Sequence, residues 1–308
     1  MSAESTPTLT EQHNPRSAGI DALSASDIVR LFAAEDRRAV EATVAIADDV
    51  ARAVEWVAAA LRAGGRLLYV GAGTSGRLGV LDASECPPTF GAEPSSVVGI
   101  IAGGDGALRT SAEGAEDDVD AGAGAMADHD VCHRDVVLGI AASGRTPYVL
   151  AALRKARGRS AKTVLLSCTP PRDDVAEYVD LFLTPLVGPE VISGSTRLKA
   201  GTATKLVLNQ VSTGAMVLLG KVYGNRMVDV KPVNQKLRGR GVSLVSEIGR
   251  VDAAAAEGAL DSADGDVKVA ALALRRGLTY DEARATLAAA NGSLRSALDQ
   301  TPAGPHDA

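Results

Sequence analysis

Five short apolar runs, separated by longer segments, constrain the fold of this chain more than any other feature. The runs lie at residues 66–70, 96–101, 135–141, 162–167 and 180–184. Continuous apolar runs of this length are typical of strands buried on both faces, and such strands occur in parallel sheets covered by helices. Helix-length segments at 147–157 and 196–222 fit that arrangement. The pattern therefore predicts a doubly wound α/β domain with a parallel sheet of about five strands.

Helical patterns precede the predicted sheet. Residues 1–20 form a polar N-terminal arm that we expect to be flexible or loosely docked. A helix capped by Ser24 or Asp27 follows, and a second helix is expected over residues 40–62, where apolar residues recur at helical spacing. These helices flank the main domain, which we place at residues 21–235.

A small helical module is predicted after the sheet. The polar segment 235–242, rich in glycine and arginine, is interpreted as a linker. Alanine-rich apolar periodicity follows, and breaks at Gly277 and at Asn291-Gly292 divide it into short helices. The three expected helices span residues 266–274, 279–289 and 293–298. We place this module at residues 243–300.

Composition excludes several classes of protein. A formal net charge of −6 and an aromatic content of 3% argue against a protein whose main role is to bind nucleic acid. No apolar run approaches the roughly 20 residues of a membrane-spanning helix, and the polar N-terminus does not resemble a secretory signal. The 3 cysteines are widely spaced and form no C-x-x-C pair. We therefore expect a cytoplasmic protein with neither a disulfide framework nor a structural zinc site.

The first predicted strand runs into a glycine-rich turn, Gly71-Ala-Gly73-Thr74-Ser75-Gly76. Turns at the carboxyl ends of parallel strands bind ligands in α/β proteins, and the N–H groups at a helix start suit a phosphate. The dinucleotide-binding pattern is incomplete, because no acidic residue ends the next strand, and the lysine of a P-loop is absent. The turn therefore predicts a phosphate site, and a tight turn without a ligand is the alternative.

Two other segments repeat this hydroxyl-rich chemistry. Ser143-Gly144-Arg145-Thr146 follows the third strand and precedes a helix-starting proline, and Ser195-Thr196 opens the last long helix. Arg145 is interpreted either as a bidentate phosphate partner or as a solvent-exposed residue. Such turns on one sheet edge can converge on one phosphoryl group, so they indicate a phosphorylated small molecule. The predicted binding residues are Thr74, Ser75, Ser143, Gly144, Arg145, Thr146, Ser195 and Thr196.

Two acidic motifs could supply catalytic groups. Glu85 lies in Ala-Ser-Glu-Cys-Pro-Pro, where we expect Pro87 to end the helix and hold Glu85 at a sharp exit. Glu113 and Glu116 are expected on one face of a helix, three residues apart. Acidic runs on helices are often solvated faces, so the residues alone leave a catalytic and a solvated interpretation open.

The same motifs resemble the N-acetylmuramic acid 6-phosphate etherases. Residues 71–91, 139–148, 194–205 and 225–230 carry the resemblance, which extends from the arm motif Thr10-Glu-Gln-His-Asn14 to the helical tail. It implies a sugar isomerase (SIS) domain with a flavodoxin-like sheet and a C-terminal module similar to ubiquitin-associated (UBA) domains. It also implies cleavage of the D-lactyl ether of N-acetylmuramic acid 6-phosphate, in peptidoglycan recycling or amino-sugar use.

The resemblance assigns the two catalytic roles. The glutamate of the Ala-Ser-Glu-Cys-Pro-Pro motif, Glu85, corresponds to the acid. The second glutamate of Glu-Gly-Ala-Glu-Asp, Glu116, corresponds to the base, and Glu113 belongs to the same motif. An ordinary glutamate is protonated only about once in 500 molecules at neutral pH. We therefore expect Glu85 to be desolvated or close to another negative charge, while Glu116 stays ionised.

The resemblance also bears on binding and assembly. Ser75, Ser143 and Thr146 correspond to the phosphate-binding hydroxyls, and the match is weaker for Ser195 and Thr196. Glu190 stands where sugar-phosphate isomerases of this fold place a base, so the resemblance places it among the substrate-binding residues and leaves an aldose–ketose isomerase as one alternative. A non-catalytic sugar-phosphate sensor is another. No metal or cofactor is expected, and analogy with SIS proteins implies a homodimer.

Overall fold

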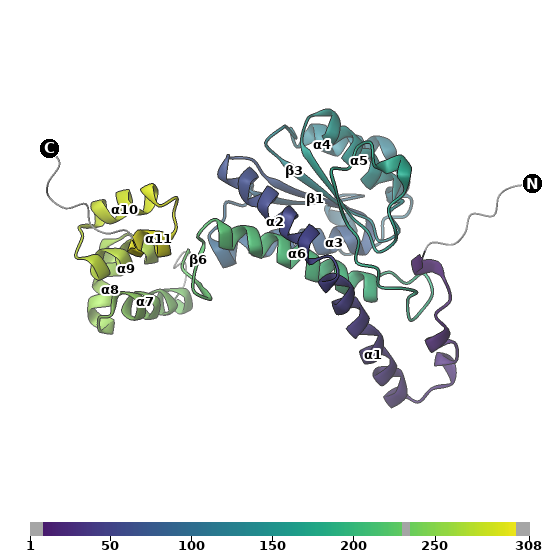
Figure 1. The fold of residues 1–308 in the computed structure, drawn as a ribbon, viewed down its shortest axis with the longest axis horizontal. Coiled ribbons are helices and arrows are strands. Elements are labelled where there is room, and N and C mark those ends of the chain that lie inside the picture. The colour runs from purple at the N-terminus through teal and green to yellow at the C-terminus, as the bar shows by residue number, and fades with distance from the viewer. Residues whose placement is uncertain (1–8, 230–234, 300–308) are drawn as a thin grey trace, which may run out of the picture. The chain divides into compact units, whose positions relative to one another are not determined.

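A parallel five-stranded sheet forms the centre of the larger part of the molecule in the computed structural model, which describes residues 9–229 and 235–299 (Figure 1). The strands are β1 (Leu67–Gly71), β2 (Val97–Ile101), β3 (Val136–Ile140), β4 (Lys162–Leu166) and β5 (Leu181–Leu183). Their order, β2-β1-β3-β4-β5, is that of flavodoxin-like folds. The predicted doubly wound sheet is therefore confirmed.

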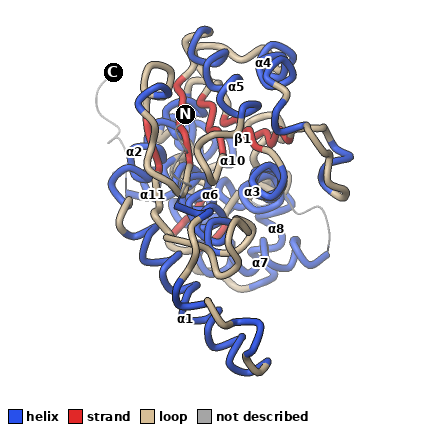
Figure 2. Tube along the Cα trace, turned by 90° about the vertical axis from the view of Figure 1, so that its right-hand side faces the viewer, coloured by secondary structure: helices blue, strands red, loops and turns tan. Residues whose placement is uncertain are grey.

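Helices cover both faces of the sheet, which explains why β1 and β3 are buried at every residue. Figures 1 and 2 show the strands between two helical layers. One layer contains α4 (Val119–Asp128) and α5 (Pro147–Gly158), and the other contains α2 (Ala47–Arg62), α3 (Gly73–Phe90) and α6 (Lys199–Leu218). Burying each large apolar side chain in these layers contributes about 1.5–3 kcal/mol.

The predicted helix over residues 40–62 is wrong, because two helices occupy this region. α1 (Ala25–Val44) ends before Ala45, and α2 begins at Ala47. The side chain of Ser24 accepts the N–H of Asp27 and caps α1, as expected. The break carries no glycine or proline, so apolar periodicity alone could not locate it.

The N-terminal arm is docked within its described part, so the expectation of a loose arm is wrong there. Three short 3₁₀ helices span Leu9–Glu11, Pro15–Ser17 and Ile20–Ala22. The hydroxyl of Ser17 donates to the carbonyl of Val191 at 2.7 Å. The N–H of Gly194 donates to the carbonyl of Thr10 at 3.2 Å. Residues 1–8 lie outside the described chain.

The chain divides into two compact units, Met1–Ser84 with Pro94–Gly214, and Glu85–Glu93 with Ala215–Ala308. The second unit contains a short hairpin of β6 (Val222–Tyr223) and β7 (Arg226–Met227). Its helices are α7 (Gln235–Gly249), α8 (Ala253–Ser262), α9 (Val267–Arg276), α10 (Tyr280–Ala289) and α11 (Leu294–Asp299). The three short helices predicted from the alanine-rich pattern are α9, α10 and α11. Their similarity to UBA domains stays a prediction.

Residues 235–242, interpreted as a linker, are the first half of α7. Leu244 and Val245, on the second half of this helix, are buried in the core of the second unit. Arg238, on the first half, pairs with Asp261 of α8 at 2.7 Å. Tertiary packing thus outweighs the helix-weakening glycines of the segment. Across the described ranges, no helix has the length and apolar character needed to cross a membrane.

Candidate active site

The first two hydroxyl-rich turns follow neighbouring strands. β1 and β3 are hydrogen-bonded to each other, with Gly71 opposite Ile140. The turns that leave these strands therefore lie at one carboxyl edge of the sheet, as predicted. The strand order reverses here, since β2 lies on one side of β1 and β3 on the other. Open α/β sheets bind ligands at such a switch point.

Glycines allow the first turn to close tightly. A Cβ atom on Gly71 would lie 2.6 Å from the backbone nitrogen of Gly76, so no larger residue fits there. α3 begins at Gly73, and Thr74 and Ser75 stand in its first turn, both half-buried. The first N–H groups of a helix have no partner within the helix. The turn thus presents N–H and hydroxyl donors at the sheet edge, which suits an anion.

The second turn is braced by the end of β4. Gly144 has a φ of +67°, a conformation that favours glycine. The hydroxyl of Thr169 donates to the carbonyl of Ser143 at 2.9 Å, and the N–H of Arg145 donates to the Ser143 hydroxyl at 3.3 Å. Thr146 precedes α5, and its side chain makes no capping hydrogen bond. This geometry leaves the Thr146 hydroxyl for another partner, while Arg145 is exposed.

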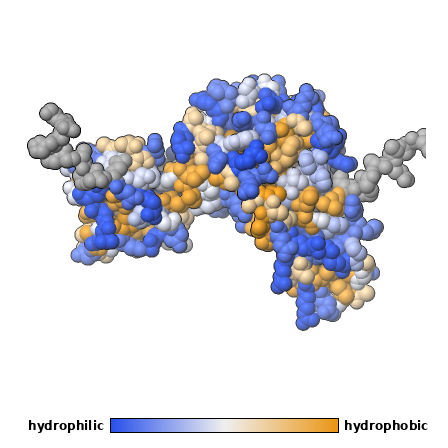
Figure 3. Space-filling model, viewed as in Figure 1, coloured by the Kyte–Doolittle hydropathy of each residue, from blue (hydrophilic) through white to orange (hydrophobic). Residues whose placement is uncertain are grey.

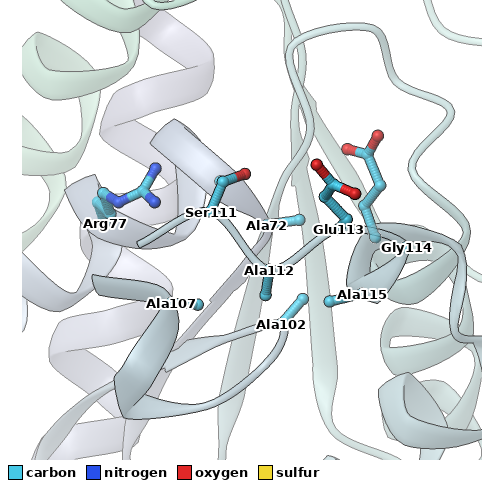
Figure 4. A pocket seen from close by; sticks show the side chains of 11 residues that line it. Ala72, Arg77, Ala102, Ala107, Ser111, Ala112, Glu113, Gly114 and Ala115 are labelled. Atoms are coloured by element: carbon cyan, nitrogen blue, oxygen red, sulfur yellow. The ribbon is translucent and has the colours of Figure 1, made fainter. Parts of the chain in front are cut away.

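A pocket of about 290 Å³ lies beside the first turn (Figure 4). Figure 4 shows Arg77 on one side of it and Glu113 on the other, with small alanine side chains between them. The lining residues are Ala72, Gly73, Arg77, Ala102, Ala107, Ser111, Ala112, Glu113, Gly114, Ala115 and Glu116. The pocket therefore brings the glycine-rich turn and the Glu113–Glu116 motif together.

The expected helical face for Glu113 and Glu116 is wrong. Gly114 adopts the left-handed conformation, with a φ of +73°, and only a 3₁₀ turn, Ala115–Asp117, follows it. Both glutamates are exposed on this loop. Arg77, which the sequence reasoning did not single out, holds the preceding segment, because its Nε donates to the carbonyl of Leu108 at 3.1 Å. The position of Arg77 directly after Gly76, the last glycine of the turn, is the sequence feature that could have identified it.

Glu85 does not stand at a helix exit, so that prediction is wrong. α3 continues through Pro87 and Pro88 to Phe90. A proline removes its own N–H donor but keeps its carbonyl, and the carbonyl of Pro87 accepts the N–H of Gly91 at 2.9 Å. The side chain of Glu85 is exposed. The single chain therefore does not bury Glu85, although we expected the proposed acid to be desolvated.

A buried carboxylate, Asp82, holds α3 one turn before Glu85. It accepts hydrogen bonds from the Tyr69 hydroxyl at 2.8 Å and from Asn209 Nδ2 at 2.6 Å. These partners belong to β1 and α6, so Asp82 ties α3 to both. The sequence reasoning missed this residue, because contacts between distant segments leave no local pattern.

The third hydroxyl-rich segment lies next to the first. A Cβ atom on Gly201, in the first turn of α6, would lie 3.7 Å from Thr74 Cγ2 and 3.5 Å from the carbonyl oxygen of Thr196. The structure thus brings the Ser195-Thr196 segment to the glycine-rich turn. α6 begins at Lys199, later than the sequence indicated.

Glu190, expected among the substrate-binding residues, caps α6 and does not line the pocket beside the first turn. Its side chain is 0% exposed. Its two carboxylate oxygens accept the backbone N–H groups of Lys199 and Ala200 at 3.0 and 2.9 Å. Desolvation raises the pKa of Glu190, and these hydrogen bonds and the charge of Lys199 oppose that rise only in part. This placement does not support the isomerase alternative, which requires Glu190 to reach a substrate carbon.

The parallel sheet of order 2-1-3-4-5, with helices on both faces, is the fold of the SIS class. Residues 49–157 match the family model of the glucokinase regulatory protein N-terminal SIS domain. The N-acetylmuramic acid 6-phosphate etherase of Klebsiella aerogenes is 50% identical over 301 residues, covering 98% of this chain and 100% of that protein. The chain belongs to the N-acetylmuramic acid 6-phosphate etherase family.

Other relatives give the same result. The N-acetylmuramic acid 6-phosphate etherase of Edwardsiella ictaluri is 51% identical over 292 residues, covering 95% of this chain and 97% of that protein. That of Gloeobacter violaceus is 52% identical over 292 residues and covers 95% of each chain. The similarity therefore includes the second unit as well as the sheet.

Proposed function

We propose that this protein cleaves the D-lactyl ether of N-acetylmuramic acid 6-phosphate, yielding N-acetylglucosamine 6-phosphate and D-lactate. It is thus a carbon–oxygen lyase of peptidoglycan recycling or amino-sugar use. Membership of the etherase family over nearly the whole chain carries the proposal. Both motif glutamates, Glu85 and Glu116, are present, and Glu116 lines the pocket beside the glycine-rich turn. A sensor that only binds a sugar phosphate needs neither carboxylate.

The phosphate group is bound at the switch point. Ser75, Ser143 and Thr146 are the proposed hydroxyl donors, supported by the adjacency of β1 and β3 and by the Thr146 hydroxyl that leaves α5 uncapped. The starts of α3 and α5 each add about half a positive charge, which favours an anion despite the net charge of −6. Thr74, Gly144, Arg145, Ser195 and Thr196 complete the proposed site.

The reaction is an elimination followed by an addition. Glu116 takes the proton from the carbon beside the open-chain aldehyde, and the electron pair of that C–H bond forms a carbon–carbon double bond. The carbon–oxygen bond to lactate breaks, and Glu85 gives its proton to the departing oxygen. Water then adds across the double bond, which restores a hydroxyl and a hydrogen on the sugar. General acid and base groups of this kind each contribute about 10²–10⁴-fold to a rate.

A homodimer is part of this proposal. The acid must be protonated at neutral pH, yet Glu85 is exposed on the single chain, so its shielding must come from the substrate or from a second subunit. α1 offers apolar side chains for a contact between subunits, since Val29, Val40 and Val44 are 67%, 50% and 68% exposed. Figure 3 shows apolar and polar surface mixed on the face turned to the viewer. Sedimentation that gives a monomer would contradict the dimer. We place the reaction in the cytoplasm, in line with three cysteines that form no disulfide bond in the structure.

Release of D-lactate from N-acetylmuramic acid 6-phosphate tests the proposed function directly. In ¹⁸O-labelled water the label should enter N-acetylglucosamine 6-phosphate and not D-lactate, because the sugar–oxygen bond breaks. An isomerase would exchange the proton beside the carbonyl without releasing lactate, and a sensor would bind the sugar phosphate without either change. Label in the lactate would contradict the elimination.

A further inference from the structure

A cluster of buried charges joins α1 to the start of α6. Glu35 on α1 is 2% exposed, and Lys199, the first residue of α6, is 0% exposed. Lys199 Nζ donates to Glu35 Oε2 at 2.6 Å. Glu190 accepts the backbone N–H of the same lysine from the other side. The proposed reaction uses none of these three side chains.

The docked N-terminal segment completes the cluster. Asn14 Nδ2 donates to Glu35 Oε2 at 2.9 Å and to the carbonyl of Pro189 at 3.2 Å. The Arg16 guanidinium forms an ion pair with the same carboxylate. Desolvation alone would raise the pKa of Glu35, but hydrogen bonds from Arg16, Lys199 and Asn14 outweigh it and lower the pKa to about 2. Glu35 is therefore ionised, and it links three segments of the chain.

Packing or helix stability alone does not account for this arrangement. A lysine at the N-terminus of a helix is disfavoured by the helix dipole. Removing an ammonium group from water costs several kcal/mol, and apolar residues of similar volume often replace a buried ion pair without loss of stability. What the charges add is a fixed geometry, because Glu35 and Glu190 together determine where Lys199 and the first turn of α6 lie.

That first turn lies against the phosphate site. Gly201 follows Lys199 by two residues, and a Cβ atom there would lie 3.7 Å from Thr74 Cγ2 and 3.5 Å from the Thr196 carbonyl. A displacement of Lys199 would therefore change the position of Thr196 relative to the glycine-rich turn. Binding is sensitive to such shifts, since polar groups must stay close to their productive positions.

We propose that Glu35 and Lys199 are positioning residues for sugar-phosphate binding. They hold the first turn of α6, and with it Thr196, against Thr74, although neither side chain touches the substrate. The N-terminal segment, which includes the motif Thr10-Glu-Gln-His-Asn14, thereby acts on the site through Glu35. This inference rests on the proposed function and extends it.

The test removes the charge of the Glu35 side chain while keeping its size. For Glu35→Gln we expect the KM for N-acetylmuramic acid 6-phosphate to rise about tenfold and kcat to change less than about threefold, because ground-state and transition-state binding are lost together. Asp135→Asn is the matched control. Asp135 is 2% exposed and pairs with Arg66 at 2.8 Å, at the opposite edge of the sheet. It should lower the melting temperature and leave KM unchanged.

A milder variant covers the case in which Glu35→Gln does not fold. Asn14→Ala removes the hydrogen bonds to Glu35 and Pro189, and we expect it to raise KM about threefold. The Kd of N-acetylglucosamine 6-phosphate, measured by calorimetry, should rise in parallel, and this measurement needs no turnover. Wild-type protein that releases no D-lactate would contradict the proposed function, while the calorimetry would still test the inference. Unchanged KM and Kd, or an equal rise in Asp135→Asn, would overturn it.

Discussion

The first compact unit places two pairs of glutamates in contrasting surroundings. Glu113 and Glu116 are exposed on the loop that lines the pocket. Glu35 and Glu190 are 2% and 0% exposed, and their oxygens accept hydrogen bonds from side chains and from backbone N–H groups. An exposed carboxylate can exchange protons with a substrate, whereas a buried, paired one is costly to disturb. Burial thus separates carboxylates that can react from carboxylates that set geometry.

The largest expected effect is on turnover by the exposed pair. Glu116→Gln should lower kcat about 10²–10⁴-fold, because the proposed base is lost. Its free energy of unfolding should change by no more than about 0.5 kcal/mol, as is usual for surface positions. D-lactate release and urea unfolding of the same samples measure both. A variant that turns over normally would remove Glu116 from the mechanism, and one that unfolds readily would break the comparison.

Glu85 extends the comparison to the second unit, where it is also exposed. Glu85→Gln should lose a similar factor of about 10²–10⁴ with the natural substrate. An analogue whose leaving group has a low pKa needs no proton, so it should recover most of the lost rate. Comparing the two substrates on wild-type and variant protein measures this recovery. Equal loss with both substrates would rule out the acid role.

The buried carboxylate of Glu35 should make the free energy of unfolding depend on pH in the acidic range. The pKa of Glu35 is lowered to about 2 from 4.5, so its stabilisation is present above pH 4.5 and is lost as the pH falls toward 2. The full contribution is about 3 kcal/mol. Urea unfolding of wild-type and Glu35→Gln proteins should therefore differ most near pH 7 and converge on acidification. Arg16, Lys199 and Asn14 face position 35 in both proteins, and Glu190, whose pKa is raised, contributes to both alike.

The smallest expected effect concerns the other exposed glutamate. Glu113→Gln should change kcat by about tenfold or less, because the family motif assigns the base to Glu116, and it should leave stability unchanged. Parallel assays with Glu116→Gln provide the comparison. A larger loss in Glu113→Gln than in Glu116→Gln would exchange the two roles.

The sheet and its first two turns could be predicted because their signals are local. Each strand is a continuous apolar run, and the glycine spacing of residues 71–76 reflects a close approach within the turn itself. The same local interpretation failed at two positions where the effect of one residue was misjudged. Gly114 converts an apparent helical face into a loop, and α3 passes through Pro87 although proline usually ends a helix.

The buried cluster could not be predicted, because its members are far apart in the sequence. Glu35 and Lys199 are separated by 164 positions, and no local pattern links the two. The sequence also placed the start of the last long helix near residue 196, so it did not show that Lys199 is the first helical residue. Only the structure shows a lysine that opposes the helix dipole there and is paired with an acidic residue from elsewhere in the chain.

The docking of the N-terminal segment has a practical consequence for recombinant work. A shortened protein that begins at α1 would lack Asn14 and Arg16, and Glu35 would then face Lys199 without two of its hydrogen-bond donors. Such a protein could fold around an intact sheet and still bind its sugar phosphate weakly. Trimming the amino end to aid crystallisation would therefore alter the ligand affinity under study.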